Sequence, residues 1–254
     1  MNCCDDQLYS SYDFRIMSKH QCKYVGSQLP LEYGCEDSWG WDIVDKPEAV
    51  RIYGSKVAFF HPNYSYGTAG VRGNRALNGG RYYWEVDLGD RVFGTCMAVG
   101  IGTKKAKLSS PSFINLIGMD ENSWGLNHKG EFWYNNECRI WNCNAKKYKP
   151  RKIGIYYDGI GGNVTFFRDG HCMGVAFDGL QNVTEDLFPI VCSTAARTTM
   201  TLGVMRKEFN SLKERCYDTI LKSISCHSHI HQLQIPRTLK AELCEKYRNN
   251  FYSF

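Results

Sequence analysis

The sequence lacks the features that mark membrane and secreted proteins. It contains no run of about 18 apolar residues, the length that a helix needs to cross a bilayer. The first residues, Met1 to Asp6, have neither the basic flank nor the apolar centre of a secretory signal. We therefore expect an intracellular protein, in the cytoplasm and/or the nucleus, that has no contact with membranes.

The motifs of common enzyme classes are also missing. Gly67, Gly70 and Gly73 are spaced like a glycine-rich loop, but they do not open a helix after a buried strand, and no Gly-Lys-Ser/Thr follows. We interpret them as turn and bulge positions. No nucleophile elbow surrounds any serine that might work with His61. The sequence therefore predicts a non-catalytic protein without a cofactor.

Paired Cys-x-x-Cys motifs are absent, although the chain has 12 cysteines. They are scattered singly through strand-like segments, so we interpret them as small buried residues in a reducing compartment. The best alternative is zinc binding by the run from Cys226 to His231. A strand-like run cannot readily close a tetrahedral site alone, so we prefer a polar linker between two helices and expect no metal site.

Strong charge is missing as well, since the net charge is only +5. Basic residues gather at 146–152, with a lesser cluster at Lys104, Lys105 and Lys107. Such runs can contact phosphate backbones or acidic proteins, but between strands they are usually solvated loops. We favour loops and do not expect nucleic-acid binding.

What the sequence does contain, from about Gly34 to Met205, is a series of short alternating or apolar runs separated by glycine. This pattern is typical of an all-β sandwich, and the Asp169-Gly170 dipeptide marks a tight hairpin. We expect Trp39, Trp41, Trp84 and Trp124 to be core or semi-buried packing residues. The predicted strands are 49–53, 56–61, 67–72, 81–87, 96–102, 123–127, 131–134, 152–158, 163–168, 172–177, 188–192 and 199–205.

The C-terminal part has a helical pattern instead. Leu212, Cys216 and Ile220 recur every four residues and form one narrow apolar stripe. A second helical pattern follows over 239–247, and Leu233-Gln234-Ile235-Pro236 lies between the two. Periodicity alone leaves open whether the stripe packs on the rest of the chain or on a partner.

This order of elements resembles a SOCS box, a short helical module that docks onto elongin and cullin proteins. The resemblance assigns elongin binding to a helix over 211–220, through Ser211, Leu212, Cys216 and Ile220. It assigns cullin binding to the segment 233–236, through Leu233, Ile235 and Pro236. The sequence departs from the pattern at Gln234, where related proteins usually carry proline.

The body of the chain resembles a SPRY domain. The segments 82–87, 97–103, 120–126, 165–170 and 188–191 follow the order of that domain. Together with the C-terminal elements, they make the chain similar to the SPRY domain-containing SOCS box protein family. The resemblance implies a mainly β protein, an antiparallel SPRY-type sandwich followed by a small α-helical SOCS box. It divides the chain into a flexible segment at 1–34, a sandwich at 35–206 and a SOCS box at 207–254.

The function that this resemblance implies is that of an adaptor. The sandwich would bind a short peptide of a target protein, and the SOCS box would recruit elongin B, elongin C and the fifth cullin with its RING subunit. The target would then be ubiquitinated and degraded by the proteasome. The alternative is a SPRY interaction scaffold that no longer recruits a ligase, because Gln234, Arg237 and Thr238 depart from the usual cullin-binding segment.

The resemblance also points to the loops that would hold the target peptide. Relatives that grip Asn-rich peptides carry Val-Trp-Gly where this chain has Thr194-Ala195-Ala196. The smaller residues predict a different or looser motif, which can still contain Asn. The expected peptide-binding residues are His61, Asn63, Tyr64, Thr95, Phe113, Leu116, Gly118, Ser193, Thr194 and Ala195.

Overall fold

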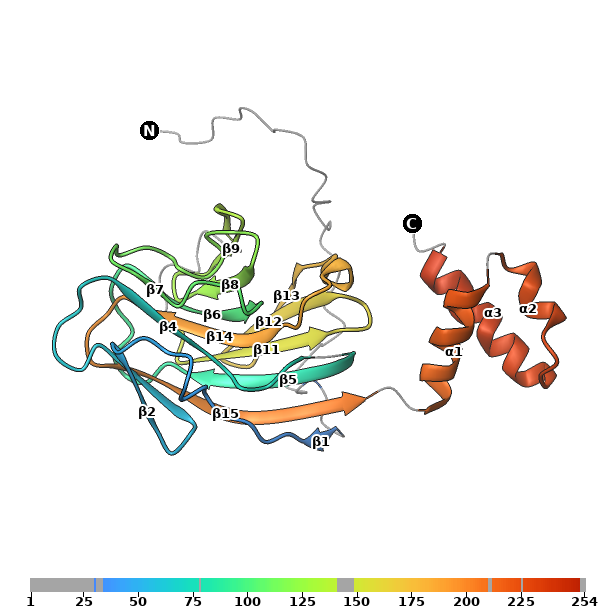
Figure 1. The fold of residues 1–254 in the computed structure, drawn as a ribbon, viewed down its shortest axis with the longest axis horizontal. Coiled ribbons are helices and arrows are strands. Elements are labelled where there is room, and N and C mark those ends of the chain that lie inside the picture. Colours follow the sequence, from blue (N-terminus) through green and yellow to red (C-terminus); the bar gives the residue numbers. More distant parts are fainter. Residues whose placement is uncertain are drawn as a thin grey trace, which may run out of the picture.

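The fold is described from a computed structural model, which covers residues 30, 34–77, 79–140, 149–209, 212–224 and 226–251. Two antiparallel sheets pack face to face, and three helices follow at the C-terminal end (Figure 1). The helices lie beyond the right-hand end of the sandwich in Figure 1, where the last strand leaves it. None of the helices in these stretches has the length and apolar character needed to cross a membrane.

The first sheet has the strand order β13-β12-β11-β5-β15-β3-β2, and β1 pairs with the later part of β15. Its strands are β1 (Cys35–Glu36), β2 (Val50–Tyr53), β3 (Val57–Phe60), β5 (Gly80–Asp87), β11 (Lys152–Asp158), β12 (Asn163–Arg168), β13 (His171–Phe177) and β15 (Thr198–Phe209).

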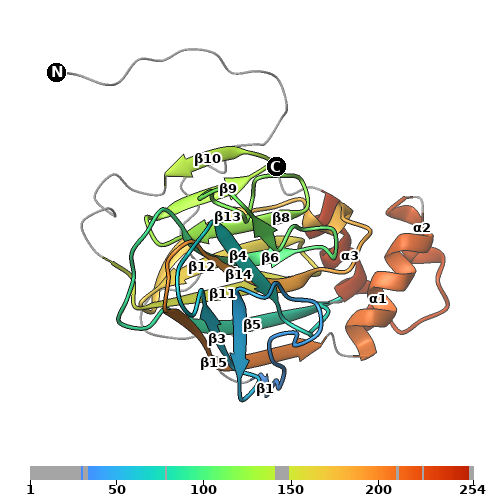
Figure 2. The same cartoon turned by 60° about the vertical axis from the view of Figure 1, so that its left-hand side comes forward.

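The second sheet has the order β10-β9-β8-β6-β14-β4-β7. Figure 2 shows β9 and β10 on the opposite side of the sandwich from β15 and β1. The strands are β4 (Thr68–Arg72), β6 (Met97–Gly102), β7 (Ser109–Ser110), β8 (Ser123–Asn127), β9 (Glu131–Tyr134), β10 (Glu137–Ile140) and β14 (Phe188–Ser193). A short 3-10 helix, η2 (Leu180–Asn182), precedes β14.

Alternation along the strands builds the main core between the sheets. In β5, Tyr82, Trp84 and Val86 point into this core, while Tyr83 lies on the opposite face. Glu85 is also buried; its carboxylate accepts a hydrogen bond from the Tyr83 hydroxyl at 2.9 Å and pairs with a lysine of β11. Because β5 is covered on both faces, six of its eight residues are buried.

A second, smaller core lies on the outer face of the second sheet. Cys96 and Ala98 of the β6 side and Cys192 of β14 pack there against Leu116 and Ile117. The segment between β6 and β8 therefore folds back over the sheet and covers it. This second core matters for function because it holds that segment in place at one end of the sandwich.

The structure confirms the predicted mainly β sandwich, and eleven of the twelve predicted strands agree with observed strands to within about two residues at each end. The twelfth, β15, runs on to Phe209, past the boundary expected at residue 206. The Asp169-Gly170 hairpin is also confirmed, since both residues have the positive φ angles, 47° and 82°, that a tight turn requires. The short strands β1, β7 and β10 were not predicted. All four residues of β10 are exposed, so its burial shows no alternation between the two faces.

The C-terminal helices are α1 (Leu212–Ser223), α2 (Ser228–Gln232) and α3 (Arg237–Phe251). They share a core of their own, formed by Tyr217, Leu221, Ile230, Leu243, Cys244 and Tyr247. The expected polar linker between two helices was wrong in one respect, because α2 occupies part of it. The linker contributes Ile230, a fully buried residue, so it is part of the packed unit.

The cysteines are not uniformly the small buried residues that we expected. Cys96, Cys192 and Cys244 are buried, as predicted. Cys35, Cys138 and Cys216 are exposed. Position in the fold decides the difference: Cys96 and Cys192 face the second core, whereas Cys216 lies on the outer side of α1.

Candidate functional site

Four loops meet at one end of the sandwich, at the left of Figure 1 and away from the helices. They are 61–67, 88–96, 111–117 and 194–197. The Ser65 hydroxyl donates to the Thr194 carbonyl at 2.6 Å, which joins the first loop to the last. The Thr68 hydroxyl donates to the carbonyls of Ser112 and Ile114, which attaches the third. The structure therefore brings the expected peptide-binding segments together.

Thr194 connects the second loop to the last. Its hydroxyl donates to the Cys96 carbonyl at 3.0 Å and accepts from the Cys96 amide at 2.9 Å. These two bonds link the start of β6 to the end of β14. Thr194 is 3% exposed, so its side chain holds the loops together and offers no surface to a peptide.

The turn after β14 is fixed by a buried polar network. The Ser193 hydroxyl accepts from the Ala195 amide at 3.0 Å and lies 2.9 Å from the Thr198 hydroxyl. The Nε2 atom of His61 lies 3.0 Å from the Ser193 carbonyl, which therefore accepts from it. His61 has a φ of 47°, a left-handed conformation that favours a tight chain reversal. These buried residues give the loops a fixed shape.

Leu116 and Gly118 are also explained by packing within the fold. Leu116 is 4% exposed and belongs to the second core. Gly118 has a φ of 85°, and a Cβ atom there would lie 2.3 Å from the carbonyl oxygen of Trp133. Any side chain at this position would collide with β9, which explains glycine without reference to a ligand.

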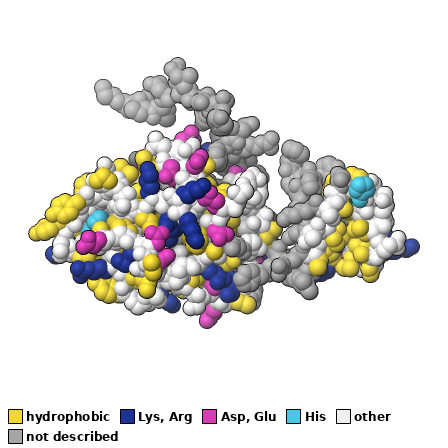
Figure 3. Space-filling view, viewed as in Figure 1, with side chains coloured by type: hydrophobic (Ala, Val, Ile, Leu, Met, Phe, Trp, Pro, Cys, Tyr) yellow, Lys and Arg dark blue, Asp and Glu magenta, His cyan; other side chains and the backbone are white. Residues whose placement is uncertain are grey.

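The exposed members of the expected set are Asn63, Tyr64, Thr95 and Phe113. Tyr64 is 75% exposed and Phe113 is 50% exposed, an unusual display of aromatic surface. Figure 3 shows apolar side chains gathered at this end of the sandwich. We call the exposed residues of the four loops the loop-end surface.

Two further aromatic residues belong to the loop-end surface but were not among the peptide-binding residues predicted from the sequence. Tyr66 is 81% exposed and Phe93 is 38% exposed. The guanidinium of Arg91 lies 5.2 Å from the ring centre of Phe93 and holds it by a cation-π contact. Tyr66 follows Tyr64 by two residues in the same loop, and this pairing of tyrosines was the sequence signal that could have identified it.

The Cys96 thiol beneath this surface is not an activated nucleophile. Burial raises the pKa of the Cys96 thiol well above its usual value, so the thiol stays neutral at physiological pH. It donates a hydrogen bond to Oδ1 of Asn115 at 2.7 Å. Cys96 thus acts as a packing and hydrogen-bonding residue of the second core.

Basic residues near the sandwich are paired with acids. Arg151 lies 3.2 Å from Asp90, and Lys152 lies 2.9 Å from the buried Glu85. Lys105 pairs with Glu185. Part of the basic run at 146–152 lies outside the described residues. The described members are consistent with a solvated loop rather than a basic binding face.

Helix α1 uses one face for packing and leaves another free. Tyr217 and Leu221 are buried against α3 and α2, while Cys216 is exposed and Ile220 is half-buried. Of the expected elongin-binding stripe, Cys216 is therefore exposed, whereas Ile220 packs partly against the helical core. Leu212 begins the helix, and Ser211 lies outside the described residues.

The expected cullin-binding segment connects α2 to α3. Leu233 and Ile235 are half-buried against the helical core, whereas Gln234 and Pro236 are exposed. The Pro236 carbonyl accepts from the Lys240 amide at 3.1 Å, so Pro236 stands at the first turn of α3. Proline is well suited to that place, because it has no amide hydrogen to leave unpaired.

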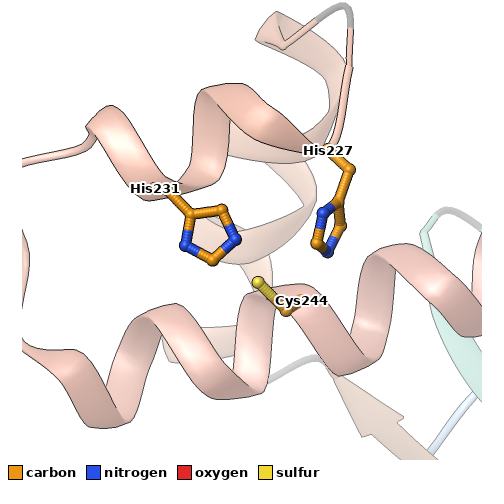
Figure 4. Close-up of side chains that lie close together, drawn as sticks. All are labelled: His227, His231 and Cys244. Atoms are coloured by element: carbon orange, nitrogen blue, oxygen red, sulfur yellow. The ribbon is translucent and has the colours of Figure 1, made fainter.

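The structure also gathers three potential metal ligands that were not predicted as a set. His227 and His231 of the α2 region face Cys244 of α3 (Figure 4). Two of these residues, His227 and His231, lie within the run from Cys226 to His231 that was considered as a zinc site. Nothing in the sequence pointed to Cys244, which is 13 positions further along the chain.

Comparison with known proteins agrees with this architecture. The SPRY domain family model matches residues 81–205. The protein named SPRY domain-containing SOCS box protein 3 of Xenopus tropicalis is 34% identical over 229 residues, which are 88% of this chain and 58% of that protein. Its namesake of Xenopus laevis is 33% identical, with the same coverage. The chain thus spans a little over half the length of these relatives.

Similar solved structures support the fold alone. The crystal structure of the TRIM65 PSpry domain superimposes with a TM-score of 0.53 at 19% sequence identity, and covers 66% of this chain and 90% of that one. The match to the family model contains strands of both sheets, from β5 to β15. With its SPRY domain at residues 81–205, its C-terminal helices and its relatives, the chain is similar to proteins of the SPRY domain-containing SOCS box family.

Proposed function

We propose that the chain is the substrate-recognition subunit of an elongin and cullin-RING E3 ubiquitin ligase. In this proposal the sandwich, residues 35–206, binds a short peptide of a target protein. The SOCS box, residues 207–254, recruits elongin B, elongin C and the fifth cullin with its RING subunit. The chain itself catalyses nothing; it raises the effective concentration of a target lysine beside the ubiquitin-conjugating enzyme.

The exposure of Cys216 next to a packed helix face carries this proposal. Helix α1 already buries Tyr217 and Leu221 within its own unit, and Ile220 packs partly against the same core, whereas Cys216 remains exposed. A helix edge of this kind, exposed at Cys216, is suited to docking in a partner groove. Insertion of Leu212 into such a groove would contribute about 1.5–3 kcal/mol.

The cullin contact rests on the segment 233–236. Gln234 and Pro236 present the outer side of the link between α2 and α3, while Leu233 and Ile235 hold the link to the helical core. In the proposal a cullin contacts this link and the start of α3. The elongin stripe and the cullin segment then belong to one packed unit, so both partners bind in a fixed relative orientation.

The loop-end surface is the proposed peptide site. Tyr64, Tyr66 and Phe113 supply flat apolar area, and exposed Asn63 and Thr95 supply polar groups at its edge. The buried network of His61, Ser193, Thr194 and Ala195 acts from beneath by keeping the loops in shape. Such a surface suits a short extended peptide, Asn-containing or of another sequence. The target is ubiquitinated inside the cell and sent to the proteasome.

A second candidate function is a scaffold that binds partners through the sandwich but recruits no ligase. The observation in its favour is the exposed Gln234, which replaces the proline of related cullin-binding segments. Arg237 and Thr238 depart from the pattern as well, and both are exposed. This scaffold would still use the loop-end surface, so only the cullin contact separates the two functions.

Reconstitution with purified elongin B, elongin C and the fifth cullin tests the proposal. We expect the wild-type chain to capture all of them. The double variant Leu212→Ala, Cys216→Ala should lose elongins and cullin together, because the stripe is removed. Pro236→Ala should keep the elongins and lose at least part of the cullin, because only the second segment changes.

Asp218→Asn provides the matched control for the elongin variant. This residue lies on the same helix, about 200° around the axis from Cys216, so it should leave capture unchanged. Elongin capture without cullin would favour the scaffold. Capture of neither by the wild-type chain would contradict the assignment of α1 as a docking helix.

Binding of a library of short peptides tests the loop-end surface. Tyr64→Ala and Phe113→Ala should each weaken a selected peptide about tenfold or more, because exposed aromatic anchors carry most of the energy of small interfaces. Tyr53→Ala is the control, since Tyr53 is similarly exposed but belongs to the β2–β3 hairpin away from the loops. Equal loss in the control would place the peptide elsewhere.

A further inference from the structure

Three side chains of the helical unit converge on one point. One ligand atom each of His227, His231 and Cys244 lies within 4.8 Å of the other two. Figure 4 shows the sulfur of Cys244 directed from α3 toward the space between the two imidazole rings. The ring centres of His227 and His231 are 5.5 Å apart, and the rings are nearly perpendicular, at 74°.

Local structure explains why the two histidines share a face. Helix α2 begins at Ser228, but His227 already has helical dihedral angles, with φ at −55° and ψ at −35°. Residues four apart in a helix stack on the same side. A strand would have presented the pair with a different spacing, so the helical conformation of this segment creates the pair.

His227 has an unmet requirement at this point. Its Nε2 atom is shielded from solvent and has no hydrogen-bond partner among the described residues. Leaving a buried polar atom unpaired lowers the stability of the folded chain. A metal ion would satisfy this nitrogen, since a neutral imidazole carries a lone pair on one ring nitrogen.

The donor set suits zinc. Two imidazoles and one thiolate are the ligands that zinc prefers, and calcium or magnesium would require oxygen. Around a tetrahedral zinc, nitrogen and sulfur ligands stand about 3.4–3.7 Å apart, so the group must contract by roughly 1 Å. His231 is exposed and can adjust its side-chain angles for this contraction. Three protein ligands leave a fourth position for water.

A bound metal would stabilise the helical unit. Its core contains six buried side chains, one of which is Cys244 itself. Small units with so little core are commonly held together by a metal or by partners. A metal on His227, His231 and Cys244 would fasten α2 directly to α3 and define the ends of the link that contains Leu233 and Pro236.

We propose that His227, His231 and Cys244 form a zinc site that joins α2 to α3. This revises the expectation from the sequence that the histidine run is a polar linker without metal. The argument against zinc assumed that all ligands come from one strand-like run. The folded chain brings the third ligand from another helix. The proposal does not depend on the ligase function.

Cobalt and zinc binding by the full-length, reduced and metal-free chain tests the site. We expect about one equivalent of Co²⁺ to give a thiolate-to-cobalt charge-transfer absorption, which Zn²⁺ then abolishes. Cys244→Ser should remove this absorption. His231→Gln should weaken zinc binding more than about 100-fold, because even the loss of an outer-sphere partner costs about 10–100-fold in metal affinity.

Cys226→Ser and His229→Gln are matched controls, because both residues lie in the same run and outside the cluster. They should bind both metals as the wild-type chain does. Circular dichroism of the metal-free variants checks folding, and His231→Gln remains informative if Cys244→Ser fails to fold. Zinc should also raise the melting temperature of the helices in the wild-type chain but not in His231→Gln.

Two results would overturn the site. One is a wild-type chain that gives no charge-transfer absorption with Co²⁺. The other is an absorption of the same strength in Cys244→Ser and an unchanged zinc affinity in His231→Gln, which would assign the metal to the remaining cysteines of the chain.

Discussion

The sandwich and the helical unit are stabilised in different ways. The sandwich core spans both sheets and contains large, fully buried residues such as Trp41, Trp84 and Phe60. Its strands are joined by antiparallel ladders. Among the described residues of the helical unit, six buried side chains from three helices form the core. The first region can stabilise itself, whereas the second has little apolar burial in reserve.

This difference in core size suits the sandwich and the helical unit to different roles. A region with a large core can display loops whose backbone shape is fixed, which suits recognition of a peptide. A region with a small core gains stability from whatever binds it, whether a partner on α1 or a metal between α2 and α3. The two regions should therefore respond differently to substitutions, to pH and to ligands.

The largest effect is expected in the sandwich from Trp84→Ala. Trp84 is 1% exposed, and its ring packs edge-on against Trp39 at 6.2 Å. Its removal should lower the free energy of unfolding by about 3–5 kcal/mol. Chemical denaturation followed by tryptophan fluorescence measures this. Tyr53→Ala, at an exposed site, should change stability little, and an equal loss there would refute the core position of Trp84.

Leu243→Ala tests whether the helical unit unfolds on its own. Leu243 is fully buried, and its truncation should cost about 2–5 kcal/mol. All six tryptophans lie between residues 39 and 141, so their fluorescence reports on the sandwich alone. Helical circular dichroism should melt earlier, with the fluorescence transition unchanged. A joint shift of both signals would mean that the two regions form one cooperative unit.

Thr194→Val tests how firmly the loop end belongs to the sandwich. The substitution keeps the shape of the side chain but removes two hydrogen bonds to the Cys96 backbone. Leaving the buried Cys96 amide unpaired should cost about 1–3 kcal/mol, while the Cys96 carbonyl keeps its hydrogen bond from the residue 194 amide. Thermal unfolding measures the loss, and hydrogen exchange of the Cys96 amide should accelerate. Wild-type stability would mean that the four loops are held mainly by other contacts.

The smallest effect is a dependence of sandwich stability on pH. Burial lowers the pKa of His128 below its usual value, and the neighbouring charge of Lys129 adds to this shift. The unfolded chain then binds the proton more readily, so stability should fall as the pH drops below about 6.5 and level off below the folded pKa. His128→Gln should flatten the dependence in denaturation curves recorded at successive pH values. An unchanged slope would assign it to other groups.

Most of the fold could be predicted from the sequence, because alternation in strands such as β5 and the Asp169-Gly170 turn are local signals. The fold class and the family were therefore accessible. The sequence did not reveal which residues of the candidate site are exposed to a ligand and which are buried and hold the loops. Thr95 and Thr194 looked equivalent in sequence, yet one is exposed and the other is buried in a backbone-linking role.

The helical unit illustrates the same limit. The stripe of Leu212, Cys216 and Ile220 is visible at helical spacing, but the packed face of α1 depends on Tyr217 meeting α3. Likewise, Cys244 joins His227 only through the packing of α2 on α3. Contacts between residues far apart in sequence are decided by tertiary packing, which local patterns do not encode.

The length of β15 has a consequence for any target held by this chain. The strand starts directly after the 194–197 loop and ends beside α1, and at about 3.3 Å per residue its 12 residues span roughly 40 Å. Because β15 pairs with β3 and β5, it forms a rigid connection between the two ends of the molecule. Under the proposed function, this connection keeps the captured peptide at a fixed distance from the ligase. Which lysine of the target is ubiquitinated then depends on the distance between that lysine and the bound peptide.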